Sequence, residues 1–99
     1  MNIKSQKNGT ELTFSLGGRF DSITAPEVQS EMEAQLVDVT KLVLDFTAVT
    51  FLSSAGIRTV IWAEQQMKNR QGTMILRNVN DQLKKVFVMT GLDTALSFE

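Results

Sequence analysis

Residues 51–58, FLSSAGIR, decide how this chain folds, because they lie between a short apolar run and a long segment with helical periodicity. The apolar run, residues 42–46 (LVLDF), has the composition of a β-strand that is buried on both faces. Ser53 or Ser54 then stands where a helix N-cap is expected, and Gly56 leaves room for a close approach. The pattern predicts a strand, a loop and a helix start. The first N–H groups of a helix have no partner within it, so the serine hydroxyls can cap them, or the helix start can favour an anion.

The length and composition limit what the chain can do. With 99 residues it can form one domain with a single core, and we expect that domain to span residues 1–99. Its formal net charge is −1, from ten basic and eleven acidic residues, so we expect no nucleic acid as a partner. It contains no cysteine and no histidine, which removes thiolate chemistry and the commonest metal ligand and general base. We therefore expect no catalytic residue, no metal and no cofactor.

No segment has the features of a membrane span or a signal peptide. Residues 1–5 (MNIKS) lack an apolar core, and no apolar run approaches the roughly 20 residues that a membrane helix needs. We expect a cytoplasmic protein without membrane insertion. The sequence does not predict its oligomeric state.

The segment before the central strand predicts a β-hairpin. Residues 3–7 and 12–16 alternate between apolar and polar side chains, and the Asn-Gly pair at residues 8–9 supplies the two positive-φ positions of a tight turn. The glycines at residues 17–18 indicate a bulge or bend at the end of the second strand.

A helix is predicted after this hairpin. Thr24 and Glu27 have the spacing of a capping box, and Pro26 is tolerated in a first helical turn. The apolar stripe of this helix, at spacings of four, consists of Val28, Met32 and Leu36.

The helix that opens at residues 53–54 places Arg58 and Trp62 one turn apart, on or near the face opposite its apolar stripe. An exposed Trp stacked with Arg is a pair that interface hot spots favour. Trp62 is equally well explained as a side chain that wraps the edge of the core. Residues 69–72 (NRQG) are expected to end the helix, with the glycine in the left-handed conformation.

The rest of the chain predicts one more strand and one more helix. Residues 73–77 (TMILR) form the strand, Asn80 or Asp81 caps the helix, and Gly91 ends it. Residues 95–98 either add a short edge strand or dock loosely. The fold class is therefore α/β, a single domain with a mixed, mostly parallel β-sheet packed with α-helices. The expected core includes Leu44, Ile57, Val60, Ile61, Ile75 and Phe87.

Asp45, near the end of the predicted central strand, is the candidate for a catalytic carboxylate. It has no histidine or lysine partner and no further ligands in the pattern. We interpret it as a turn or cap residue.

Three short elements resemble those of the STAS domain family. Residues 53–57 (SSAGI) resemble its signature loop, in which an Asp-Ser-Ser/Thr-Gly-Leu run opens a helix. Residues 18–21 (GRFD) resemble the Gly-Arg-Leu-Asp element of the family, and residues 90–92 (TGL) resemble the end of its last major helix. The three elements stand in the family's order, so the resemblance covers essentially the full chain and implies the STAS fold.

The resemblance also implies a regulatory protein that is not an enzyme. Stand-alone STAS domains of this length resemble anti-sigma factor antagonists. Unphosphorylated, these bind an anti-sigma factor, which is a serine kinase of the histidine-kinase ATPase type, and so release a sigma factor. The alternative that the resemblance implies is a scaffold or accessory subunit of another complex, such as an ABC-type lipid transporter.

The phosphoacceptor position departs from the family pattern. In the family the hydroxyl immediately before the signature glycine accepts the phosphate, and here Ala55 stands there, while Ser53 replaces the family's Asp. The chain would then be a permanently competent binder, be switched through Ser54 or Ser53, or serve a different STAS partner. Ser54 is the better candidate for phosphorylation, because Ser53 is expected to cap the helix. The expected partner surface comprises Asp21, Ser53, Ser54, Ala55, Gly56, Arg58 and Trp62.

Overall fold

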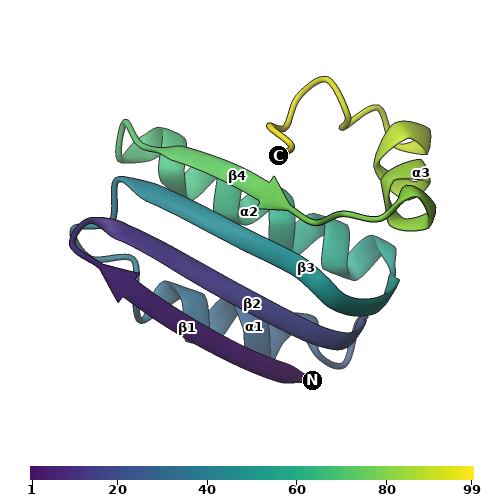
Figure 1. Ribbon diagram of the computed structural model, residues 1–99, viewed down its shortest axis with the longest axis horizontal. Coiled ribbons are helices and arrows are strands. Elements are labelled where there is room, and N and C mark those ends of the chain that lie inside the picture. Colours follow the sequence, from purple (N-terminus) through teal and green to yellow (C-terminus); the bar gives the residue numbers. More distant parts are fainter.

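Alternating apolar residues build a four-stranded sheet, which the computed structural model describes together with three helices over all 99 residues (Figure 1). The strands lie in the order β1-β2-β3-β4. β1 pairs with β2 in antiparallel fashion, whereas the β2–β3 and β3–β4 pairs are parallel, which confirms the predicted mixed, mostly parallel sheet. In chain order the elements are β1 (Asn2–Asn8), β2 (Glu11–Phe20), α1 (Ala25–Glu33), β3 (Lys41–Leu52), α2 (Ser54–Asn69), β4 (Thr73–Arg77) and α3 (Asp81–Met89).

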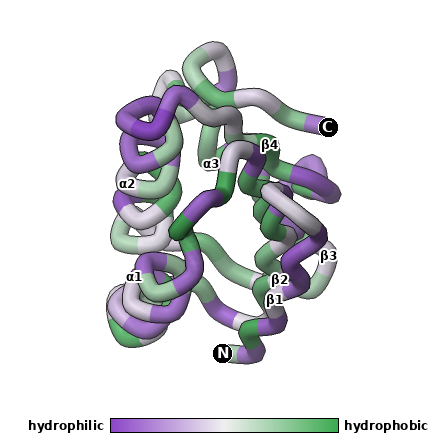
Figure 2. The backbone as a smooth tube through the Cα atoms, turned by 90° about the vertical axis from the view of Figure 1, so that its left-hand side faces the viewer, coloured by the Kyte–Doolittle hydropathy of each residue, from purple (hydrophilic) through white to green (hydrophobic).

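One face of the sheet packs against the helices, and the core lies between the two layers. Figure 2 shows α1 and α2 in one layer and the strands in the other. The ring of Phe46 lies at the centre of this core, 6.4 Å from the ring of Phe20 and 6.2 Å from that of Phe87 (centroid distances). Phe87 connects α3 to β3 in this way. Of the predicted core, Leu44, Ile57, Val60 and Phe87 are buried, as expected.

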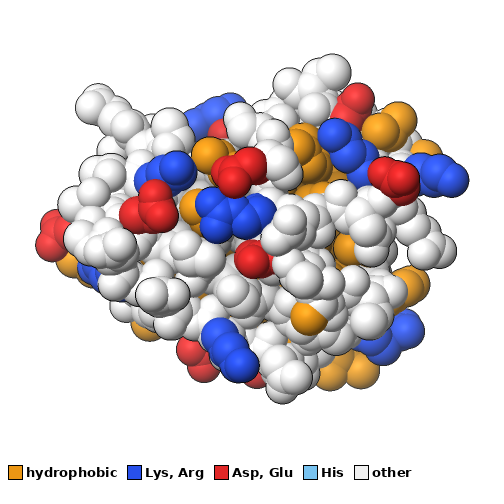
Figure 3. All heavy atoms as spheres, in the orientation of Figure 1, with side chains coloured by type: hydrophobic (Ala, Val, Ile, Leu, Met, Phe, Trp, Pro, Cys, Tyr) orange, Lys and Arg blue, Asp and Glu red, His pale blue; other side chains and the backbone are white.

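The other face of the sheet carries no helix and faces the viewer in Figures 1 and 3. Ile75 lies on this face, because its neighbours Met74 and Leu76 in β4 are the ones that reach the core. Ile75 is therefore half-buried, and its assignment to the core was wrong. Ile61 is also only half-buried and packs against the edge of the core.

The hairpin turn lies one residue later than predicted. Asn8 still pairs with Glu11 in the ladder, so Gly9 and Thr10 occupy the two turn positions. Gly9 has a φ of 65°, whereas neither neighbour is left-handed. A glycine at the first central position is what a type II′ turn requires. The predicted bulge at Gly17 and Gly18 is confirmed, since the β2–β3 register shifts on both sides of that pair.

Two helix ends differ from the prediction. At the end of α2 the left-handed residue is Gln71, with a φ of 58°. The N–H of Gly72 then donates to the carbonyl of Met67 at 2.7 Å, which closes a Schellman motif. Gly72 is needed for space, because a Cβ there would lie 2.7 Å from the carbonyl oxygen of Thr40. The predicted left-handed end at Gly91 is confirmed by its φ of 74°.

The start of α1 also differs, because Thr24 is the N-cap residue but its side chain makes no cap hydrogen bond. Its hydroxyl donates instead to the carbonyl of Arg19 at 2.7 Å. The predicted capping box with Glu27 is therefore absent, and the side chain of Asp21 organises the turn.

Residues 95–98 add a single parallel bridge to the outer edge of β4, between Leu76 and Phe98. The N–H of Leu76 donates to the carbonyl of Ser97 at 2.9 Å, and the N–H of Glu99 donates back to the carbonyl of Leu76 at 2.8 Å. The tail therefore covers part of this edge.

Candidate partner-binding surface

The link between β3 and α2 is a single residue, Ser53. β3 continues to Leu52, so the loop that the sequence predicted between the strand and the helix is reduced to this one residue. The N–H of Ser53 donates to the carbonyl of Phe20 at 3.0 Å, and its Oγ accepts from the N–H of Gly56 at 3.5 Å. This confirms Ser53 as the N-cap and fixes the start of α2 against the end of β2.

Gly56 is buried where α2 crosses the end of β2. A Cβ at this position would lie 2.7 Å from the carbonyl oxygen of Phe20 and 2.8 Å from Cδ1 of Leu52. The close approach that the sequence indicated is therefore an approach of the chain to itself. Gly56 can support a partner surface only by bringing its neighbours to the right place.

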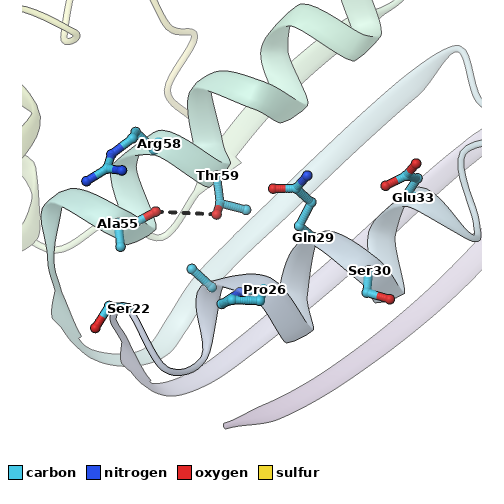
Figure 4. A pocket seen from close by; sticks show the side chains of 9 residues that line it. Ser22, Pro26, Gln29, Ser30, Glu33, Ala55, Arg58 and Thr59 are labelled. Atoms are coloured by element: carbon cyan, nitrogen blue, oxygen red, sulfur yellow. Dashed lines mark hydrogen bonds between the residues drawn. The ribbon is translucent and has the colours of Figure 1, made fainter.

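Ser54, Ala55 and Arg58 are the accessible residues of the first turns of α2. Ser54 is the first helical residue and is exposed, and its hydroxyl makes no hydrogen bond within the chain. Ala55 and Arg58 line a shallow groove of about 590 Å³ between α1 and α2 (Figure 4). Arg58 forms no ion pair within the chain, so its guanidinium is available to a partner.

The α1 side of this groove was missed by the sequence interpretation. Its polar residues follow one face of α1 and the turn that precedes it. Figure 4 shows these side chains across the groove from Ala55 and Arg58. No motif marks them, and only the docking of α1 beside α2 could have found them. They are Ser22, Gln29, Ser30 and Glu33, and Pro26 also lines the groove.

Trp62 is half-buried and packs against the edge of the core. The structure contains two cation–π contacts, one of Arg19 with Phe51 and one of Lys84 with Phe98, and neither involves Trp62. Of the two interpretations of Trp62, the stack with Arg58 is therefore not the one that the structure contains. The alternative, that Trp62 wraps the edge of the core, is the one the packing supports.

Asp21 lies at the end of β2 and holds the turn into α1. Its Oδ1 accepts hydrogen bonds from the N–H groups of Ile23 at 3.0 Å and Thr24 at 3.2 Å, and Oδ2 lies 3.4 Å from Nε of Arg19. The hydrogen bond from the Thr24 N–H, helped by the others, lowers the pKa of Asp21 below its ordinary 3.8 despite partial desolvation. Its carboxylate is thus largely used within the chain.

Asp45 lies within β3 and is therefore not the turn or cap residue that the sequence predicted, although its side chain does have a structural role. Its Oδ1 accepts from the N–H of Thr47 at 2.9 Å and from the hydroxyl of Thr47 at 2.6 Å. The side-chain amide of Asn78 donates to the same oxygen at 3.3 Å, which ties β3 to the end of β4. Desolvation raises the pKa of Asp45, but these hydrogen bonds and the nearby Arg77 outweigh it, and the pKa lies below the ordinary 3.8.

This lowered pKa predicts a pH-dependent contribution of Asp45 to stability. A carboxyl whose pKa is lower in the folded state stabilises the fold above its unfolded pKa, and this contribution is lost as the pH falls through the folded pKa. Asp45→Asn should therefore reduce the free energy of unfolding most near pH 7. The difference from the wild type should shrink below about pH 4, near the unfolded value. Urea denaturation at a series of pH values measures this, and a difference that stays constant with pH would contradict it.

None of the three helices has the length and apolar character to cross a membrane. No three acidic, cysteine or histidine side chains come together as a metal-binding group.

Comparisons of the sequence and of the structure with known proteins agree on one family. The family model described as the STAS domain matches residues 2–98. The anti-sigma-B factor antagonist of Listeria monocytogenes is 26% identical over 103 residues, covering 100% of this chain and 90% of the relative. The anti-sigma factor antagonist SpoIIAA, solved in its unphosphorylated form, superposes with a TM-score of 0.81 at 17% identity, over 99% of this chain and 87% of that one. An anti-sigma factor antagonist from Mycobacterium paratuberculosis also gives a TM-score of 0.81, at 23% identity and over 98% and 83% of the two chains.

Proposed function

This chain belongs to the STAS domain family, and on that premise we propose that it acts as an anti-sigma factor antagonist. It binds an anti-sigma factor, a serine kinase of the histidine-kinase ATPase type, and thereby releases a sigma factor. The observation that carries the proposal is the accessible first part of α2, where Ser54, Ala55 and Arg58 lie on a rigid helix start beside the groove to α1. Relatives over the full chain bear the name anti-sigma-B factor antagonist, which supports this assignment.

The surface itself suits recognition better than catalysis. The groove is shallow and lined by small apolar and neutral polar side chains, with one cation, Arg58, and one carboxylate, Glu33. None of its hydroxyls is paired with a base: that of Thr59 donates to the carbonyl of Ala55 within its own helix, and those of Ser22 and Ser30 make no hydrogen bond within the chain. A partner can therefore dock on this groove and on the start of α2 without any chemistry being supplied by the chain.

The switch of this antagonist is changed by Ala55, which cannot carry a phosphate. Ser54 is the hydroxyl that can replace it, because it is exposed, lies at the first position of α2 and is free of hydrogen bonds. The partial positive charge of a helix start tolerates a phosphate there. A phosphate would add about −1.5 to −2 charges to a contact surface and so oppose docking. In the transfer, Oγ of Ser54 would bond to the γ-phosphorus of ATP, ADP would leave, and the hydroxyl proton would pass to the kinase or solvent.

The partner can be identified and the switch tested in one series. The wild-type chain is used to recover its partner from the source bacterium, and mass spectrometry identifies it. We expect a protein with an ATPase domain of the histidine-kinase type. Ser54→Glu, which imitates the added charge, should then weaken its binding at least tenfold, and Arg58→Ala should weaken it by a similar factor. Titration calorimetry with the purified partner measures both.

Ser5→Glu is the matched control, because Ser5 is exposed on β1, away from α2. It should bind like the wild type. Equal binding of all variants would exclude the start of α2 as the interface. Recovery of a membrane transporter's ATPase would instead favour the scaffold alternative. Incubation with the partner and ATP tests the switch separately: phosphate on Ser54 supports a relocated switch, and unphosphorylated chain that stays bound indicates a constitutive binder.

A further inference from the structure

Two large apolar side chains stay in solvent at one corner of the molecule. Ile23, in the turn between β2 and α1, is 85% exposed, and Phe51, near the end of β3, is 39% exposed. Both lie at the carboxyl ends of the parallel strands. In Figure 3 hydrophobic and basic side chains lie together at this corner, at the lower right. Neither residue was part of the surface predicted from the sequence.

Arg19 connects the two apolar residues. It pairs with Phe51 across the β2–β3 ladder, and its guanidinium carbon lies 4.1 Å from the centre of the Phe51 ring. Its Nε lies 3.4 Å from Oδ2 of Asp21, whose Oδ1 in turn holds the N–H of Ile23. These contacts fix the guanidinium although the side chain is 64% exposed. Its two terminal nitrogens make no hydrogen bond within the chain, so they remain free as donors.

A hollow of about 390 Å³ lies beside Arg19 and Ile23. The glycines of the β2 bulge, Gly17 and Gly18, form part of its wall and contribute no side chains. Gly18 has a φ of 92°, so another residue there would be strained. The bulge therefore leaves space for an apolar side chain of another molecule next to a fixed guanidinium.

We propose that this corner, formed by Arg19, Ile23 and Phe51 together with the hollow beside Arg19 and Ile23, is a second contact region for the protein that binds the start of α2. It rests on the proposed function in that the occupant is the same anti-sigma factor. The segment that docks here presents an apolar side chain to Ile23 and the hollow, and a carboxylate to Arg19.

The charges at the corner select this chemistry. The carboxylate of Asp21 is 19% exposed and already accepts from two N–H groups and faces Arg19. The accessible charge is therefore that of Arg19, whose planar fork matches a carboxylate. An Arg stacked on an aromatic ring beside exposed aliphatic surface is also the composition that binding hot spots favour. A basic or purely polar partner segment would leave both features unused.

The experiment uses the full chain and the anti-sigma factor recovered with the wild type, and measures binding by titration calorimetry. Ile23→Ala and Arg19→Gln should each weaken binding about tenfold. Val37→Ala is the matched control: Val37 is also an exposed aliphatic residue, 67% accessible, but it lies before the start of β3, at the opposite end of that strand from Phe51. It should leave binding unchanged. Urea denaturation establishes that each variant keeps the wild-type fold.

The outcomes separate this inference from the proposed function. Binding by the wild type that Ile23→Ala and Arg19→Gln leave unchanged overturns the corner and leaves the proposed function standing. Absence of any binding to an anti-sigma factor overturns both, because the corner is assigned to that partner. Loss of self-association in Ile23→Ala, seen by analytical ultracentrifugation without a change in partner affinity, would assign the corner to a second copy and also overturn the inference. If Val37→Ala weakened partner binding as much as Ile23→Ala does, the inference would also be overturned, because the loss of affinity would not be specific to the corner.

Discussion

Replacing Gly56 by valine should lower the free energy of unfolding by about 3 kcal/mol, although the change adds only apolar atoms. The added Cβ would lie 2.7 Å from the backbone carbonyl oxygen of Phe20 and 2.8 Å from Cδ1 of Leu52. The first neighbour is backbone and the second is a buried side chain, so neither can easily move aside. The clash can be relieved only if α2 moves away from β2. Because Ser53 and Ser54 travel with α2, the variant should also lose affinity for its partner.

Gly56→Ala gives the sharper form of this test. At an ordinary helical position, replacing glycine by alanine stabilises a helix by about 1 kcal/mol. Here the same change should be destabilising, because even one methyl group meets the Phe20 carbonyl. Lys68→Ala, at an exposed position of the same helix, is the control and should be nearly neutral. Thermal and urea denaturation measure all three variants, and a more stable Gly56→Ala would disprove the steric account.

Replacing Phe46 by alanine should cost about 3–5 kcal/mol of the free energy of unfolding. Phe46 has no exposed surface, and its ring contacts those of Phe20 and Phe87, so its removal opens a cavity between β2, β3 and α3. Domains of this kind have about 5–15 kcal/mol in total, so the loss is a large share of the stability.

Phe98→Ala is the matched control for the Phe46 variant. Phe98 is also a phenylalanine in an aromatic contact, 5.4 Å from the Phe87 ring, but it is half-buried at the outer edge of β4. Its replacement should cost less than about 2 kcal/mol. Equal losses for the two variants in urea denaturation would mean that the core is not centred on Phe46.

The sequence predicted the fold well because its strongest signals are local or periodic. The alternation around Phe14, the apolar run around Leu44 and the cap at Ser53 each act within one element, and all appear as predicted. Ile75 was assigned wrongly because an apolar run does not say which of its residues face the core. Which side chains of β4 face the core depends on how β4 pairs with β3, and the sequence of β4 alone does not carry that information.

The candidate surface could be predicted only along the helix start. Ser54 and Arg58 follow from the motif and from helical spacing. The α1 wall of the groove and the corner at Ile23 depend on how separate elements pack together. Trp62 shows the same dependence on packing: helical spacing places it one turn from Arg58, but contact with the core decides where its ring lies.

The single-residue link between β3 and α2 has a consequence for the thermodynamics of recognition. A surface carried on a flexible loop must be immobilised when a partner docks, and that loss of freedom subtracts from the affinity. With Ser53 bonded on one side to Phe20 and on the other to Gly56, the chain has almost no freedom left to lose there. Its recognition surface is preorganised, so complex formation should need little rearrangement on this side, and any slow conformational step should belong to the partner.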